Sequence, residues 1–233
     1  MEMILEIRMR FSMKKAIKGY LVFTSCIYRI VMFGALPFAL IALYILLTVF
    51  MEGNAFLLFC AIPFLIIMAE IVADTWLFGG IQRKDAAKMD FLKTSSKGMG
   101  LLRNALTMDL VRRFLSFSGV MVICLLVNIN IGKGMEMFGG SVIKGLGVIL
   151  ALILSAYAVS VLCTLLSRFG TMLWQSLMAG YLGLFMESVC VGFMVSLGHP
   201  LIWCCVFGVL ALGISVLAVK VVMKNVRGGY YDE

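Results

Sequence analysis

Charged residues are scarce in this chain of 233 residues: only 14% are Asp, Glu, Lys or Arg. A soluble domain of similar size usually has about 25% charged residues. Hydrophobic residues make up 63% of the chain, and the mean hydropathy is +1.07. Too little polar surface is therefore available to cover a water-soluble globule, and the composition predicts an integral membrane protein.

Motifs that carry chemistry are also missing. The chain has no G-x-x-x-x-G-K-[ST] loop to hold a nucleotide, no HExxH, no GxSxG and no clustered Asp pair. Its single histidine, His199, is expected to be solvated in an external turn. The seven cysteines show no CxxC and no zinc-like spacing, so they are expected to act as small buried hydrophobes. We expect no enzyme activity, no metal and no cofactor in this chain itself.

Long apolar runs dominate what is present, and about 20 such residues cross a bilayer as a helix. They predict an all-α polytopic fold in one transmembrane domain over residues 1–233. The fifth run is interrupted by Gly180, Gly183, Glu187 and Gly192, so one span and a broken or re-entrant segment both remain open. Small residues there and around Ser155 favour close helix packing. The six expected spans are 31–50, 55–78, 114–131, 142–166, 172–196 and 201–222.

The distribution of Lys and Arg indicates the orientation. Eighteen of the twenty basic residues flank the spans on one side, and only Lys133 and Lys144 fall on the other. By the positive-inside rule both termini are cytoplasmic. The net charge of +8 is therefore interpreted as topological, with no nucleic acid as partner. No cleavage site follows the first apolar run, so we expect the first span to be retained. The basic segment 1–29 is expected to include an interfacial helix.

Four acidic residues lie in or near the apolar runs: Glu52, Glu70, Asp74 and Glu187. Glu52 is expected to be solvated in an external turn. Glu70 and Asp74 are four residues apart, on one face near the cytoplasmic end of the second span. Two interpretations stay open: they cap the inner vestibule, or they pair with arginines of the basic segments. Glu187 lies deeper, where an ionisable group suggests function. Glu70, Asp74 and Glu187 are the candidates for a substrate path or gate.

The longest polar segment, 79–113, lies on the cytoplasmic side. Residues 81–94 form a plausible short helix, Ser95, Ser96, Gly98 and Gly100 interrupt it, and a second helical stretch from about Leu101 leads into the third span. One interpretation is a docking element for a soluble partner. The other is a solvated basic loop that fixes the topology or touches anionic lipid.

The segment QRKDAAKMDFLKTSSKGMGLLRNALTMDLVRR resembles the loop between spans two and three of type-2 ABC exporter permeases. The plan of a basic N-terminal segment, six spans and a cytoplasmic C-terminus is also similar to that family. One departure is the very short connection between spans five and six, where the family usually has small re-entrant helices. The resemblance implies that a coupling helix contacts a separate ATPase through Arg83, Lys84, Asp85, Met89, Phe91 and Leu92.

The expected function is thus the permease subunit of an ATP-driven exporter of a hydrophobic or amphipathic compound such as a peptide, lipid or drug. The resemblance implies two separate ATP-binding subunits, which hold ATP and Mg, and a second permease copy or sister permease. Small size and compact loops suit a bacterial inner (cytoplasmic) membrane. Two alternatives stay open: a membrane scaffold or regulatory protein that does not transport, and a proton-coupled carrier using Glu70 and Glu187.

Overall fold

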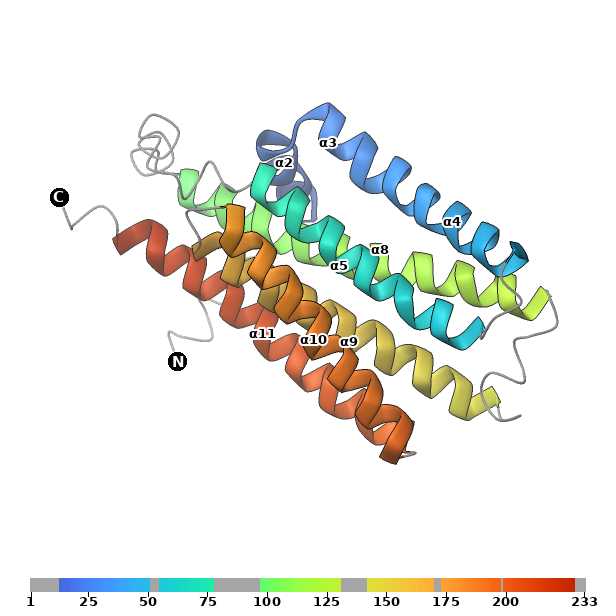
Figure 1. Cartoon of the computed structure of the whole chain (residues 1–233). Helices are drawn as coiled ribbons and strands as arrows, with labels where there is room; N and C mark the ends of the chain where they lie inside the picture. Colours follow the sequence, from blue (N-terminus) through green and yellow to red (C-terminus); the bar gives the residue numbers. More distant parts are fainter. Residues whose placement is uncertain are drawn as a thin grey trace.

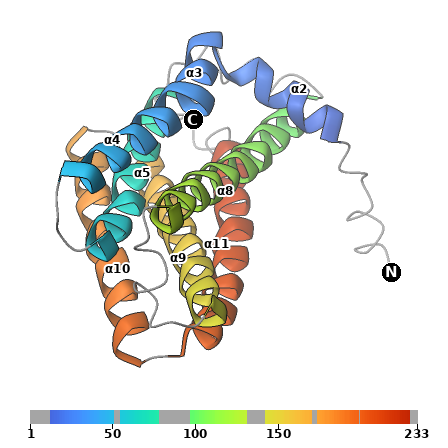
Figure 2. The same cartoon turned by 90° about the vertical axis from the view of Figure 1, so that its right-hand side faces the viewer.

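The computed structural model describes residues 13–50, 55–77, 97–130, 142–169, 173–197 and 199–228, and these residues are helical apart from short connections. The chain begins with α2 (Met13–Phe23) and α3 (Cys26–Ile30). A π-helical turn, η1 (Val31–Ala35), joins α3 to α4 (Leu36–Phe50). The long helices that follow are α5 (Ala55–Leu77), α8 (Gly98–Asn130), α9 (Val142–Phe169), α10 (Leu173–Leu197) and α11 (Pro200–Gly228). The long helices lie side by side, while α2 turns away from them along one end of α8 (Figures 1 and 2).

Four of these helices are long and apolar enough to cross a membrane: Cys26–Val49, Gly98–Asn130, Gly145–Arg168 and Pro200–Lys224. The structure thus supports an all-α membrane protein. Helices α5 and α10 lie beside these four with 23 and 25 residues, or roughly 35 Å each at 1.5 Å per residue. The fifth apolar run is one uninterrupted helix in the structure, with no break at Gly180 or Gly183.

Helix α9 is the centre of the bundle. In its apolar stretch 72% of the residues are buried, against 17% in the first and last candidate spans. Small side chains at Ala151, Ser155, Ala156 and Ser160 are almost fully buried, so neighbouring helices approach α9 closely. Hydrogen bonds between Tyr157 and Ser215 (2.8 Å) and from the Cys204 thiol to the Gly147 carbonyl (3.0 Å) join α9 to α11.

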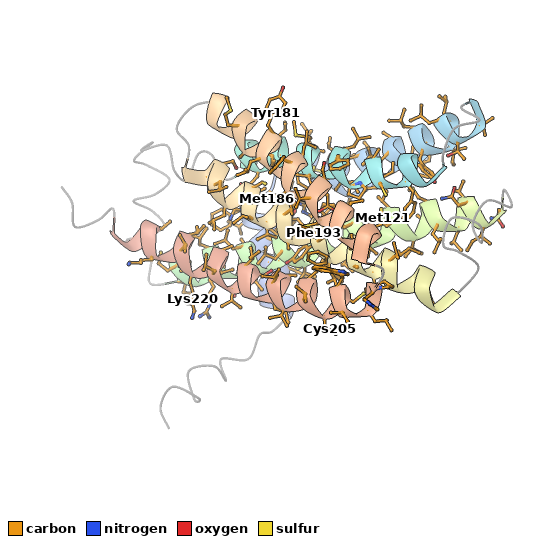
Figure 3. The ribbon with its side chains drawn as sticks, turned by 60° about the horizontal axis from the view of Figure 1, so that its bottom comes forward. Met121, Tyr181, Met186, Phe193, Cys205 and Lys220 are labelled. Carbon is orange, nitrogen blue, oxygen red and sulfur yellow. The ribbon has the colours of Figure 1, made fainter. Side chains whose placement is uncertain are left out.

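The exposed faces of the outer helices are apolar. Phe38 on α4, Phe185 on α10 and Val209 on α11 are each more than 60% exposed. Tyr181, Cys205 and Lys220 are exposed side chains of α10 and α11 (Figure 3). Such a surface suits acyl chains. The cysteines were expected to be buried, and this is wrong for two of them. Cys60, Cys124 and Cys163 are buried, but Cys26 and Cys205 are exposed on this apolar surface.

Close packing of α10 depends on Gly183. A Cβ atom at this position would lie 2.8 Å from Cys163 Sγ and 3.3 Å from Ile67 Cγ2, with both neighbours fully buried. We expect Gly183→Ala to destabilise the bundle by about 1–3 kcal/mol, because α10 has to move away from α5 and α9. The measurement is the thermal unfolding midpoint in detergent.

Gly192→Ala is the matched control, since nothing lies within 4 Å of a Cβ at Gly192 on the same helix. It should leave the midpoint unchanged or raise it, because alanine favours a helix by up to about 1 kcal/mol over glycine. Equal effects of the two substitutions would contradict the packing described here.

Candidate functional site

Six charged side chains form a buried cluster at one end of the bundle. We call Glu70, Asp74, Asp109, Arg112, Arg113 and Arg168 the ion-pair cluster. Its three carboxylates and three guanidinium groups balance in formal charge. Arg168 is the most exposed member, with 9% of its side chain accessible, and the others are at most 1% accessible.

Helix periodicity explains why these six residues lie at the same level of the bundle. Glu70 and Asp74 are one turn apart near the end of α5, and Asp109, Arg112 and Arg113 occupy successive positions of one face of α8. Arg168 lies in the last turn of α9. The end of α5, the first half of α8 and the end of α9 therefore meet at the same level of the bundle, and each contributes charge.

Arg112 binds two carboxylates. Its Nη1 donates to Glu70 Oε1 at 2.8 Å, and its Nη2 donates to Glu70 Oε2, which gives a two-pronged contact between α8 and α5. Its Nε also donates to Asp109 Oδ1 at 3.1 Å within α8. Glu70 is thus held by an arginine 42 residues away in the sequence.

Asp74 brings the third helix into the cluster. It accepts from Arg113 Nη2 at 2.6 Å, and from Arg168 Nε and Nη2 at 2.7 and 2.6 Å. Arg113 Nε in turn donates to Asp109 Oδ2 at 2.9 Å. Carboxylate and guanidinium groups therefore alternate from α5 through α8 to α9 and join the three helices in one network.

Tyrosines from the N-terminal segment cover this cluster. The guanidinium carbon of Arg112 lies 6.0 Å from the centre of the Tyr28 ring, within the range of a cation–π contact. Tyr20 on α2 is buried, and burial raises the pKa of its phenol above the usual range although nearby Arg112 acts in the opposite direction. Helix α2 itself packs on the start of α8, where a Cβ at Gly19 would lie 3.0 Å from the Leu101 carbonyl oxygen.

Glu187 lies apart from the ion-pair cluster, on α10. Its side chain is fully buried, and Ser155 of α9 donates a hydrogen bond to Oε1 at 2.9 Å. The other oxygen, Oε2, has no hydrogen-bond partner within the described part of the chain. Glu70 and Glu187 therefore occupy different surroundings: one faces two arginines and the other a serine hydroxyl.

A second polar contact fixes the opposite part of α8. Asn128 Nδ2, which is fully buried, donates to the Tyr44 hydroxyl of α4. Sequence reasoning did not single out this pair, because an isolated Asn and an isolated Tyr in apolar runs give no indication of a partner 84 residues away. Asp109 was missed for a related reason, since it stands in a segment that looked solvated.

The sequence-based candidates thus fall into three groups. Glu70 and Asp74 come together, and the alternative of pairing with arginines of the basic segments is the one the structure shows. Glu187 is buried elsewhere, and His199 is exposed as expected. Glu52 and the coupling candidates Arg83, Lys84, Asp85, Met89, Phe91 and Leu92 lie outside the described residues.

Among the described residues no group of three or more His, Cys, Asp or Glu side chains is placed to hold a metal ion. Every carboxylate of the ion-pair cluster already accepts from a guanidinium group, so the cluster joins α5, α8 and α9. No protein-family model, curated protein or solved structure matches the chain.

Proposed function

We propose that this chain is the permease subunit of an ATP-driven exporter, with six spans and both termini in the cytoplasm. One observation carries the proposal. The segment that resembles a coupling loop leads directly into α8, which is a single helix of 33 residues and bears three of the six members of the ion-pair cluster. A displacement of that loop would be transmitted along α8 to the residues that join α5, α8 and α9.

The mechanism follows from this linkage. Closure of two ATPase subunits on ATP moves the 81–97 segment, and α8 transmits the movement as a rigid lever. Because Arg112 and Arg113 hold Glu70 and Asp74, the inner ends of α5 and α9 move with α8. The substrate is hydrophobic or amphipathic, and Glu187 lies on its path or gate between α9 and α10.

Neither alternative has this support. In a proton-coupled carrier that relays protons between Glu70 and Glu187, Glu70 would have to leave both nitrogens of Arg112 in every cycle. A membrane scaffold does not require the partner-binding segment to be continuous with a buried charge cluster that spans three helices.

Purification from native membranes tests the proposal. We expect the tagged chain to elute with a separate protein that carries a P-loop, at a ratio of one ATPase per permease, and with ATP hydrolysis in the same fractions. Replacing the P-loop lysine of that partner by alanine should abolish the hydrolysis, which shows that a contaminant is not responsible. Micromolar nucleotide binding by the isolated chain, or its elution without any ATPase, would contradict the proposal.

A further inference from the structure

One nitrogen of the ion-pair cluster is left over. Arg113 is buried, its Nε donates to Asp109 and its Nη2 to Asp74, but its Nη1 has no hydrogen-bond partner within the described residues. Leaving a buried charged donor unpaired costs about 1–3 kcal/mol or more. A ligand that accepts a hydrogen bond from Arg113 Nη1 would remove this cost.

A small cavity lies beside Arg113, between α8, α9 and α11. Its volume of about 10 Å³ is room for a ligand the size of one water molecule. Three polar side chains line it, Arg113, Thr164 and Arg168, and the rest of its wall is aliphatic, for example Leu106, Val161 and Ala218.

The lining offers donors and positive charge. Two guanidinium groups line the cavity, and no carboxylate is among the residues that do so. The Thr164 hydroxyl donates to the Val161 carbonyl at 3.0 Å, so towards the cavity its oxygen can only accept. A water molecule could donate one hydrogen to Thr164 but would find no further acceptor among the side chains of the lining, whereas a single-atom anion needs donors only.

We propose that this cavity binds one chloride ion, held by Arg113 Nη1 beside the positive charge of Arg168, where α8, α9 and α11 meet. The alternation of negative and positive groups then continues outward from Asp74 and Asp109 through the two arginines to the anion. The site lies between α8, α9 and α11, and α11 supplies no member of the ion-pair cluster. The inference does not depend on the proposed transport function.

Thermal unfolding of the full chain in nanodiscs of neutral phosphatidylcholine tests this, with potassium chloride compared with potassium gluconate at equal ionic strength. Chloride should raise the midpoint by a few degrees and saturate, because it binds only the folded state. Ala218→Val should remove this dependence, since the added methyl groups fill the cavity while the ion-pair cluster stays intact. Ala211→Val is the matched control: Ala211 is a buried alanine of α11 that does not line the cavity, so the dependence should persist.

A second measurement needs no variant. Bromide should replace chloride, and crystals grown in bromide should show one anomalous peak beside Arg113. Equal midpoints in both salts and no peak would mean that a water molecule fills the cavity, which overturns the proposal. Stabilisation by anionic phosphatidylglycerol, with none by chloride, would assign the site to a lipid phosphate oxygen and would also overturn it.

Discussion

Glu70→Gln is expected to destabilise the folded protein by about 3–5 kcal/mol, the cost of removing one partner from a buried ion pair. The substitution keeps the size of the side chain but leaves the cluster with two carboxylates for three guanidinium groups. Arg112 would keep at most one hydrogen bond to α5, and Asp109 would be its only remaining carboxylate partner among the described residues. Unfolding midpoints in detergent, together with the yield of monodisperse protein, provide the measurement.

Glu187→Gln is the matched control, because it makes the same chemical change in another fully buried glutamate. A carboxamide still offers the oxygen that accepts from Ser155, and no basic partner is abandoned among the described contacts of Glu187. We expect an effect of at most about 1 kcal/mol. Equal losses from the two substitutions would show that the ion pairs of Glu70 with arginine contribute no extra stability.

A double variant separates charge balance from side-chain volume. In Glu70→Met with Arg112→Met, one negative and one positive charge leave together, and Asp74, Asp109, Arg113 and Arg168 remain balanced. Replacing a buried ion pair by apolar groups is often neutral or stabilising. Much of the stability lost in Glu70→Gln should therefore return. Failure of the double variant to recover would mean that the geometry of this pair, and not its charge, holds α5 on α8.

Phe91→Ala combined with Leu92→Ala is expected to weaken association with the ATPase strongly and to abolish substrate-stimulated hydrolysis, while membrane insertion stays normal. In the proposed function these side chains are the apolar anchors of a short cytoplasmic segment with little core of its own. Anchors of this kind cost about 2 kcal/mol or more each when truncated. Two of them would weaken binding by roughly a thousandfold if the losses add. Co-elution of the ATPase and substrate-stimulated hydrolysis are the measurements.

The control for this prediction removes the same kind of surface elsewhere. Phe33→Ala with Phe38→Ala truncates two side chains that are 52% and 76% exposed on η1 and α4. It should leave the ATPase bound, because this surface faces the membrane in the proposed topology. If the Phe91/Leu92 variant kept full association with the ATPase and full transport, the prediction would be contradicted. The loop would then only fix the topology, and the scaffold or the carrier would be favoured.

Apolar runs in the sequence were enough to place the long helices, because about 20 such residues have few other structures open to them in a bilayer. The largest difference between an apolar run and its helix is at the start of the third span. The apolar run begins at residue 114, after Arg112 and Arg113, and the helical stretch predicted from about Leu101 is confirmed, because α8 already begins at Gly98. The two arginines looked like the polar edge of a span, and they are instead buried and neutralised by Glu70, Asp74 and Asp109.

Pairing between helices was harder to predict than the helices themselves. The spacing of Glu70 and Asp74 indicated one face and a role for arginines, but not which of the many basic residues would meet them. Ser155 was noted for its small size and Glu187 for its charge, yet nothing in either run shows that they share a hydrogen bond. Such partners depend on the rotation of each helix about its axis, which packing around α9 decides.

The sequence separations within the ion-pair cluster also bear on how the chain is made. Synthesis runs from the N-terminus, so α5 leaves the ribosome with Glu70 and Asp74 before any of their arginines exist. Arg113 follows Asp74 by 39 residues, Arg112 follows Glu70 by 42, and Arg168 follows Asp74 by 94. The ion pairs between α5 and α8 can therefore form only after α8 has been translated, and the pair between Asp74 and Arg168 only after α9. Until then Glu70 and Asp74 have none of the arginines that hold them in the folded protein.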